Sequence, residues 1–248
     1  MTNFSIENKR ILIVGASSGI GVELTKECHK NGAQLILTSR NCDVLKTQLP
    51  KNIQNEAIFI DLDITDNKQI SELCKKIENI DGFVYTPGLV KLFPVQFIDE
   101  NHLNSVRVPI FDGAVFLMTA LLRNKKINNN ASLVFISSIS SSFPYKGGAV
   151  YTSSKAALEA YSKTLALELS SKKIRSNCIK AALVETKILE ETRENLDKEI
   201  YDHHIKKYPL GLGKPIDVAN AILFLLSDAS IWITGTEIIL DGGLTAGA

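Results

Sequence analysis

The chain has 248 residues, 45% of them hydrophobic, which is enough for a sizeable core in one α/β domain. Its 28 basic and 27 acidic residues nearly cancel, which argues against a nucleic-acid-binding protein, because such proteins carry an excess of positive charge. Short apolar runs, the lack of a signal segment and four scattered cysteines predict a cytoplasmic protein with no membrane, nucleic-acid or metal partner.

The first predicted strand, residues 9–14, runs directly into a glycine-rich turn with the spacing G-x-x-x-G-x-G, and a helix follows over residues 22–30. A strand, such a turn and a helix N-terminus can hold a nucleotide pyrophosphate, because backbone N–H groups approach it closely. The pattern alone is equally compatible with a tight turn that binds nothing. The candidate phosphate-binding residues of the turn are Gly15, Ser17, Ser18, Gly19, Ile20 and Gly21.

The second predicted strand, residues 34–38, ends at Ser39 and Arg40. NAD-binding proteins of this kind place an acidic side chain here, about 20 residues past the turn, to bind the ribose hydroxyls. A guanidinium instead can hold a 2′-phosphate by two hydrogen bonds. We therefore predict NADP as the cofactor, with Ser17 as a further hydroxyl donor. Two alternatives are a plain surface arginine and an arginine that stacks on adenine and tolerates both cofactors.

A third strand is predicted over residues 56–62, and Thr65 or Asp66 could simply cap the helix that follows it. The fourth strand, residues 81–85, leads to Gly88. A largely helical region then covers residues 99–126 and contains Pro109. Proline has no N–H, so we expect the helix to kink there and to leave the carbonyl of residue 105 without its partner.

The fifth strand, residues 133–138, ends at Ser138, and a helix carrying Tyr151 and Lys155 follows and extends to about residue 171. Residues four apart share one face of a helix, so this phenol and ammonium point the same way. A cation within about 4–6 Å favours the phenolate and lowers the tyrosine pKa from about 10. The pair is therefore a candidate proton donor and acceptor, although such a pair can equally lie on a solvated face.

The remaining predicted elements are a sixth strand, a charged helix, a further helix and a last strand, over residues 174–179, 185–208, 217–226 and 237–240. Strands that alternate with helices imply a parallel sheet. The predicted fold class is α/β, a Rossmann-type doubly wound parallel sheet of about seven strands with helices on both faces. We expect one NAD(P)-binding domain over residues 1–248, with a substrate lid at about 183–210.

Taken together, these residues closely resemble the short-chain dehydrogenase/reductase family, in its single-domain branch of about 250 residues. The resemblance covers nearly the whole chain and is nearest to 3-oxoacyl-acyl-carrier-protein reductases and related carbonyl reductases. Ser138 stands thirteen residues before Tyr151, the usual interval in the family. The matching elements, in order, are Gly15-x-x-x-Gly19-x-Gly21, Asp63-Ile64-Thr65, Gly88, Ser138, Tyr151-x-x-x-Lys155, Thr186 and Asp241-Gly242-Gly243.

The resemblance implies catalytic roles for three residues. Tyr151 would protonate the carbonyl oxygen as hydride arrives from the nicotinamide, or deprotonate an alcohol in the reverse direction. Ser138 would hold that oxygen by a hydrogen bond, and Lys155 would bind the nicotinamide ribose and lower the Tyr151 pKa. The cofactor carries the hydride, and the protein places the groups and supplies the proton.

The resemblance also implies cofactor contacts at residues outside the glycine turn. Asp63 would accept a hydrogen bond from the adenine amino group, with Ile64 beside the ring. Val184 and Thr186 would hold the carboxamide and so fix which face of the nicotinamide is presented. Gly88 keeps the last position of the family's Asn-Asn-Ala-Gly segment, and homo-oligomers, commonly tetramers, are expected.

Three departures from the family pattern stand out. Residues 85–88 read Tyr-Thr-Pro-Gly, and residues 181–182 are alanines where the family has Pro-Gly. The family's fourth catalytic residue, an asparagine that supports a water relay from the lysine, is replaced by Ile110, or by Phe111 one residue on. This loss implies an altered relay, slower turnover or a retired enzyme. We hypothesise that the backbone carbonyl freed by Pro109 holds the relay water instead.

The substrate should enter beneath the lid, whose apolar residues could line a pocket or simply pack on the core. Two basic clusters could dock an acidic carrier protein, although helix dipoles explain them more simply. They are Arg123, Lys125 and Lys126, and Lys172, Lys173 and Arg175. We expect a small-molecule or carrier-linked carbonyl substrate for an NADP(H)-dependent oxidoreductase. The alternative is a non-catalytic or weakly active NADP-binding protein that retains the fold.

Overall fold

Each buried strand of this chain is followed by helical structure, and the computed structural model shows the parallel sheet that this alternation predicts. The structure describes residues 3–186, 189 and 205–247. Among them, seven parallel strands form one sheet in the order β3-β2-β1-β4-β5-β6-β7. The strands are β1 Arg10–Val14, β2 Gln34–Ser39, β3 Ile58–Asp61, β4 Ile80–Tyr85, β5 Ile127–Ser138, β6 Arg175–Ala181 and β7 Glu237–Leu240. The predicted Rossmann-type sheet is confirmed.

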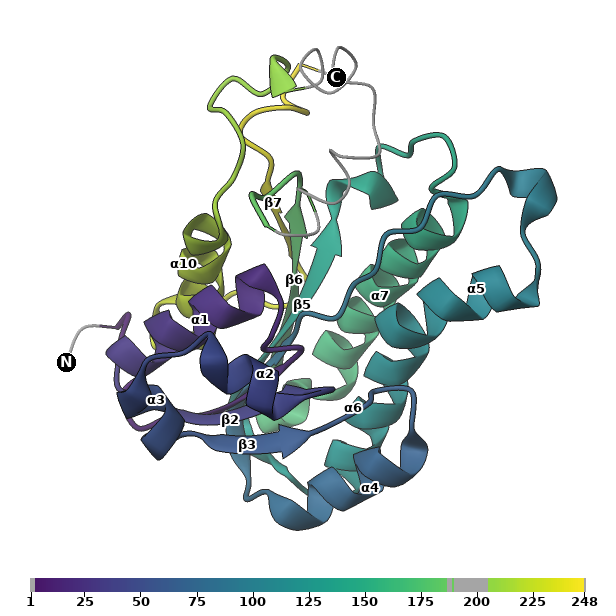
Figure 1. The fold of residues 1–248 in the computed structure, drawn as a ribbon. Helices are drawn as coiled ribbons and strands as arrows, with labels where there is room; N and C mark the ends of the chain where they lie inside the picture. The colour runs from purple at the N-terminus through teal and green to yellow at the C-terminus, as the bar shows by residue number, and fades with distance from the viewer. Residues whose placement is uncertain (1–2, 187–188, 190–204, 248) are drawn as a thin grey trace.

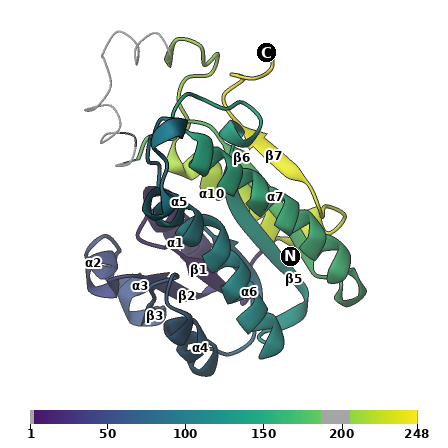
Figure 2. The same ribbon diagram turned by 90° about the vertical axis from the view of Figure 1, so that its right-hand side faces the viewer.

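Helices cover both faces of the sheet (Figures 1 and 2). Helices α1 and α10 lie together on one face, and α4, α6 and α7 lie on the other. The described α-helices are α1 Gly19–Lys30, α2 Cys42–Thr47, α3 Lys51–Glu56, α4 Asn67–Lys76, α5 Glu100–Arg107, α6 Gly113–Arg123, α7 Ala149–Glu168 and α10 Pro215–Leu226. A π-helical turn, Val108–Asp112, joins α5 to α6.

Strand β1 shows how the sheet builds two cores. Successive side chains of a strand point to opposite faces. Leu12 and Val14 accordingly pack in the cluster shared with α4, α6 and α7, whereas Ile11 and Ile13 pack in the cluster shared with α1 and α10. Each fully buried Leu or Ile side chain contributes roughly 1.5–3 kcal/mol of hydrophobic free energy. The central strands are thereby fixed from both sides.

One continuous helical stretch, Glu100–Arg123, is long and apolar enough to cross a membrane by length and composition. The uninterrupted apolar runs of the sequence are all short and predict no such stretch. In the structure its second half packs on the sheet, where Ala114, Leu117 and Leu121 are fully buried. Packing in the protein core therefore accounts for part of its apolar character.

Candidate active site

The candidate site lies where the strand order reverses, between β1 and β4. In doubly wound sheets, ligands bind outside the carboxyl ends of the strands at this point. The glycine turn follows β1 (Figure 1). Ser39 is the last residue of β2 and Arg40 follows it, Gly88 comes after β4, and Ser138 is the last residue of β5. The sheet thus brings residues from distant parts of the chain to one edge.

Ser138 and Tyr151 meet where the end of β5 reaches the first turn of α7. Their hydroxyls form a hydrogen bond, and the Ser140 N–H donates to the Ser138 oxygen at 3.2 Å. Burial raises the pKa of Tyr151, and the hydrogen bond with Ser138 offsets part of this rise. The predicted lowering of this pKa is therefore wrong for this structure, because the ring packs beside Val106 and Ile110 and burial dominates. A phenol that keeps its proton at neutral pH is suited to donate it.

Lys155 lies one turn further along α7 and is only 2% exposed. Its ammonium donates to the carbonyl of Ile136 at 2.7 Å and lies 5.7 Å from the centre of the Tyr151 ring. Burial lowers the pKa of Lys155 to about 8. Gly88 is its neighbour, since a Cβ built at Gly88 would lie 3.5 Å from the Lys155 ammonium. The amine therefore titrates near neutral pH and can exchange protons beside the tyrosine.

The glycine turn packs so closely against the surrounding chain that side chains at its glycines would collide with neighbouring atoms. Gly15 has a φ of +78°, in the left-handed region that favours glycine. A Cβ at Gly21 would lie 2.6 Å from the carbonyl oxygen of Gly15, and one at Gly19 would lie 2.8 Å from Thr186 Cγ2. Ser18 caps α1 by accepting the Gly21 N–H at 2.9 Å. This closely packed turn and the positive end of α1 fit the pyrophosphate of a dinucleotide.

Thr86, so far only a departure from the family pattern, holds the glycine turn in place. Its hydroxyl lies 2.9 Å from the carbonyl oxygens of both Val14 and Gly15, and 3.3 Å from the Ser18 hydroxyl. These bonds tie the end of β4 to the turn after β1. The available signal was the position of Thr86, directly after a buried strand at the carboxyl edge of the sheet.

The helix before β5 changes from α- to π-helical geometry around Pro109, where the sequence predicts a kink. Helix α5 ends at Arg107, and the π-helical turn follows before α6. The Tyr85 hydroxyl, a second departure with no predicted role, donates to the Pro109 carbonyl at 2.6 Å and stabilises this turn. Ile110, at the asparagine position, is fully buried against Val106. An apolar side chain therefore occupies the position at which the resembled family has the asparagine amide. The relay water stays a prediction.

Ser39 and Arg40 have different environments at the end of β2. Ser39 is buried, and its hydroxyl donates to that of Ser17 at 3.0 Å. Arg40 is exposed and makes no ion pair with any residue that the structure describes. Its guanidinium is therefore available for an anion next to the glycine turn.

Asp63 and Ile64 follow β3 at the same edge. The Asp63 carboxylate accepts from the N–H and hydroxyl of Thr65, at 2.9 and 2.7 Å. Of the two predicted caps, the structure selects Asp66, which accepts the Lys68 N–H at 2.8 Å at the start of α4. Ile64 packs into the core and is 8% exposed, so it offers little surface to a ligand.

Val184 and Thr186 return the chain to the glycine turn. Val184 forms an isolated parallel bridge with Gly213 and packs in the same apolar cluster as Ile20, while Thr186 lies over Gly19. Most of the predicted lid, residues 187–188 and 190–204, lies outside the described residues. Two apolar residues of the predicted lid are described, Leu189 and Tyr208, and both are buried.

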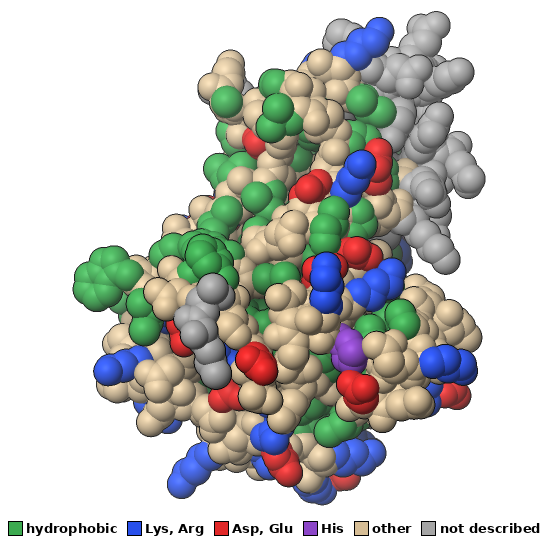
Figure 3. Space-filling view, turned by 90° about the vertical axis from the view of Figure 1, so that its left-hand side faces the viewer, with side chains coloured by type: hydrophobic (Ala, Val, Ile, Leu, Met, Phe, Trp, Pro, Cys, Tyr) green, Lys and Arg blue, Asp and Glu red, His purple; other side chains and the backbone are tan. Residues whose placement is uncertain are grey.

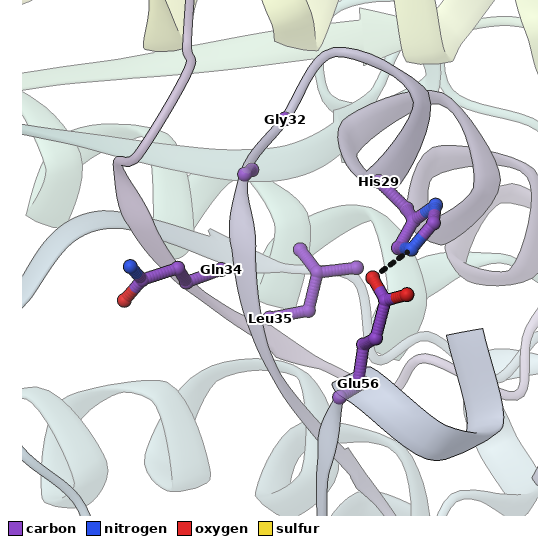
Figure 4. Close-up of a pocket in the computed structure, with 7 residues that line it drawn as sticks. His29, Gly32, Gln34, Leu35 and Glu56 are labelled. Carbon is purple, nitrogen blue, oxygen red and sulfur yellow. Dashed lines mark hydrogen bonds and ion pairs between the residues drawn. The ribbon is translucent and has the colours of Figure 1, made fainter. Parts of the chain in front are cut away.

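A surface cavity of about 240 Å³ lies at the opposite end of the molecule (Figure 4). It is lined by the first residues of β2, Gln34 and Leu35, and by the hydrogen-bonded pair of His29 and Glu56, whose Nε2 and Oε2 are 2.8 Å apart. Because Gln34 begins β2, the cavity faces the amino ends of the strands. It is therefore separate from the residues gathered around Tyr151.

The two basic clusters also lie at the amino ends of the strands, one just before β5 and the other at the start of β6. Arg175 is buried and donates to the Leu225 and Ser227 carbonyls at 2.7 and 3.2 Å. Lys126 donates to the Ile77 carbonyl at 2.7 Å. These contacts show structural roles for two cluster members, away from the candidate active site.

Fold and site together define an oxidoreductase that uses NAD(P). Residues 15–245 match the family model described as Enoyl-(Acyl carrier protein) reductase. The chain is 32% identical to the 3-oxoacyl-[acyl-carrier-protein] reductase FabG of Thermotoga maritima, over 96% of this chain and 98% of that protein. It is 30% identical to the 2,5-dichloro-2,5-cyclohexadiene-1,4-diol dehydrogenase LinX of Sphingobium indicum, over 98% of each.

Among solved structures, the crystal structure named as a short-chain alcohol dehydrogenase from Sinorhizobium meliloti 1021 superposes with a TM-score of 0.92. The two chains are 25% identical, and the match covers 100% of each. The chain belongs to the short-chain dehydrogenase/reductase family.

Proposed function

We propose that this chain is an NADP(H)-dependent oxidoreductase that reduces a carbonyl group to a secondary alcohol, or catalyses the reverse reaction. The observation that carries this proposal is the hydrogen-bonded pair of Ser138 and Tyr151 beside the buried Lys155, at the edge of the sheet that holds the glycine turn. A phenolic proton donor at the edge of the sheet where a dinucleotide would bind supports this proposal.

When bound, the nicotinamide supplies the hydride that reduces the carbonyl carbon. Ser138 would hold the substrate oxygen, and Tyr151 would donate its phenolic proton to that oxygen as the carbon is reduced. Lys155 would bind the ribose hydroxyls and, with a pKa of about 8, help to return a proton to Tyr151. Val184 and Thr186 would hold the carboxamide and fix the face presented to the substrate.

The choice of NADP rests on Ser39 and Arg40. No acidic side chain occupies the end of β2 itself, where it would repel a 2′-phosphate. The Arg40 guanidinium, which makes no ion pair with a described residue, can hold a phosphate by two hydrogen bonds. The hydroxyl of the preceding Ser39 bonds to that of Ser17 at 3.0 Å.

An apolar or carrier-linked carbonyl, such as a 3-oxoacyl thioester, suits the surroundings of the site. Exposed apolar side chains gather in the segments that follow Gly88 and Ser138, and a bond of 2.9 Å from the Phe93 N–H to the Gly147 carbonyl joins the segments. Those side chains are Leu89, Leu92, Val95, Phe97, Phe143 and Tyr145. Lys91 and Lys146, exposed on the same segments, are better placed to meet an acidic carrier than the two basic clusters.

The proposal is tested with the purified protein and NADPH against acyl-thioester, steroid, sugar and quinone carbonyls, and with NADP⁺ against cyclic diols. The Tyr151→Phe variant should bind NADPH normally, measured by cofactor fluorescence, yet lose about a hundredfold to ten-thousandfold in activity, because the positioned proton donor is gone. Full activity in this variant would remove Tyr151 from the mechanism. NADPH binding without turnover of any compound would favour the alternative, a non-catalytic NADP-binding protein.

A cytoplasmic homo-oligomer, a tetramer by family resemblance, is the proposed working form. Ile231 and Trp232 are largely exposed close to the edge strand β7, and Ile239 on β7 is half-exposed. Figure 3 shows hydrophobic side chains gathered toward one margin of the face that carries α1 and α10. Exposed apolar groups next to a sheet edge favour association. The four cysteines are unpaired and buried, in keeping with a reducing compartment.

A further inference from the structure

A largely buried ion-pair network lies beside α7, the helix that carries Tyr151 and Lys155. Lys180 on β6 is 3% exposed and Glu159 on α7 is 7% exposed. The Lys180 ammonium lies 3.3 Å from Glu159 and 3.2 Å from Glu237 at the start of β7. Glu237 also pairs with Lys163 at 2.5 Å. Two ammonium groups and two carboxylates therefore balance one another, with Lys180 and Glu159 buried, Glu237 partly buried and Lys163 exposed at the surface.

Lys180 is an unexpected residue in this position. Every residue of β6 is buried, and a charge buried there is costly unless it is paired and hydrogen-bonded. An apolar side chain at position 180 would complete the strand without the three polar partners that Lys180 has, Ser142, Glu159 and Glu237. The network therefore needs a reason beyond the folding of β6.

The network forms hydrogen bonds to the chain on both sides of Ser138. Lys180 donates to the Ser142 hydroxyl at 2.7 Å. The Ser137 hydroxyl donates to Glu159 at 2.5 Å. Ser137 directly precedes the catalytic serine, and Ser142 ends the short 3₁₀ turn that follows it.

Within the turn, local bonds set its shape. The Ser140 N–H donates to the Ser138 oxygen at 3.2 Å, the Ser141 hydroxyl donates to the Ser138 carbonyl at 2.9 Å, and the Ser142 N–H donates to the Ile139 carbonyl at 3.0 Å. These bonds join neighbours along the chain. The bond from Lys180 connects the far end of the turn to the sheet.

We propose that Lys180 is a positioning residue that holds Ser142 and thereby fixes the turn from which Ser138 presents its hydroxyl to Tyr151. This inference rests on the proposed reductase activity. Lys180 acts through the turn and not on the substrate, so its loss should lower kcat and leave the KM for NADPH unchanged. Misplacement of a reacting group by about 1 Å can cost about a hundredfold in rate.

The first test is Ser142→Ala, which removes the acceptor of the Lys180 bond at an exposed position and leaves every charge of the network in place. We expect kcat to fall about tenfold to a hundredfold with an unchanged KM for NADPH, and Ser142→Thr, which keeps the hydroxyl, to restore it. Ser170→Ala is the matched control, because this exposed serine bonds to the Leu167 carbonyl at the far end of α7. A wild-type kcat in Ser142→Ala would overturn the proposal.

The second test is the double variant Lys180→Met with Glu159→Gln, which leaves no unpaired carboxylate at Glu159. Its kcat loss should be at least that of Ser142→Ala, because the Glu159 charge also acts on the pKa of Lys155. Adding Ser142→Ala should lower kcat no further, because Lys180→Met has already broken the link to Ser142. A fully additive further loss would contradict the proposal.

A readout that needs no turnover separates this inference from the proposed function. The ¹³Cζ shift of labelled Tyr151, assigned with Tyr151→Phe, reports the hydrogen bond between the Tyr151 and Ser138 hydroxyls. This shift should change in Ser142→Ala and return in Ser142→Thr, whether or not a carbonyl is reduced. An unchanged shift would refute the positioning role even in an active enzyme.

Discussion

Burial, more than the distance between charges, sets the proton affinity of the two titrating residues in the site. It raises the pKa of Tyr151 and lowers that of Lys155 to about 8. Both shifts favour the neutral form of the group, as expected for removal from water. The resting site thus holds a protonated phenol beside an amine that titrates near neutral pH. This state is prepared to donate a proton, which favours carbonyl reduction.

The Lys155 shift makes stability depend on pH with a definite sign. Its pKa falls from 10.5 to about 8 on folding, so between these values the unfolded chain binds more protons and stability rises with pH. Below pH 8 both states are charged, and burial of the charge costs about 3 kcal/mol. We expect the free energy of unfolding, relative to Lys155→Met, to rise by about this amount from pH 7.5 to 10.5. Urea titrations of both proteins at each pH measure it, and a constant difference would contradict the buried charge.

Arg40 should decide between the two cofactors. A hydrogen bond to a charged group contributes about 1.5–3 kcal/mol, so Arg40→Ala should lower kcat/KM for NADPH about tenfold to a hundredfold. The value for NADH should hardly change, because NADH has no 2′-phosphate. Steady-state kinetics with both cofactors measure the effect. Equal efficiency with NADH in the wild type would overturn the NADP assignment, and equal losses with both cofactors would indicate stacking on adenine.

At the scale of elements, the close approach of α1 to the glycine turn depends on Gly21. A Cβ there would lie 2.6 Å from the Gly15 carbonyl oxygen and 2.8 Å from the Ala16 Cα, and neither backbone atom can turn aside. We expect Gly21→Ala to destabilise the protein by about 1–3 kcal/mol and to weaken NADPH binding. Gly213→Ala is the control, because its Cβ would make ordinary contacts at 3.5 and 3.6 Å. Thermal unfolding and NADPH titration of both variants measure the two effects. Equal losses of stability and of NADPH affinity in the two variants would refute this reasoning.

The sequence located elements whose signal is local and missed those that depend on tertiary contacts. Strand β7 matches its prediction, and β1 and β2 differ from theirs by one residue. Strand β5 begins at Ile127 and not at residue 133, because its polar first half gives no buried-strand pattern. Helices α2 and α3 are too short for periodicity to show. Their formation depends on the neighbouring sheet.

The same limit applies to the candidate site. The motif residues reach one edge of the sheet because each follows a predicted strand, which spacing alone can anticipate. The partners of Tyr85 and Lys180 cannot be anticipated in this way. Pro109 and Glu237 reach them only through the strand order and the placement of helices on the sheet.

At the scale of the whole molecule, the parallel sheet separates two ends with different contents. The carboxyl ends of the strands carry the glycine turn, the catalytic helix and the exposed apolar segments. The amino ends carry the cavity beside His29 and the basic clusters. We therefore expect the chain to meet its substrate at the carboxyl end, which leaves the sheet edges β3 and β7 for other contacts.

Assembly through the β7 side can be tested at Trp232, which is 96% exposed next to the exposed Ile231. If copies of the chain bury this side, Trp232 should be a major contact, because buried interface tryptophans commonly cost 2 kcal/mol or more when removed, roughly 30-fold or more in the dissociation constant. Trp232→Glu should therefore shift the sedimenting species to lower mass across a concentration series. Val44→Glu is the control, since Val44 is an exposed apolar residue on α2, away from β7. An equal mass distribution for Trp232→Glu and wild type would exclude this side as the interface, whereas a mass change only in Val44→Glu would place the interface beside α2.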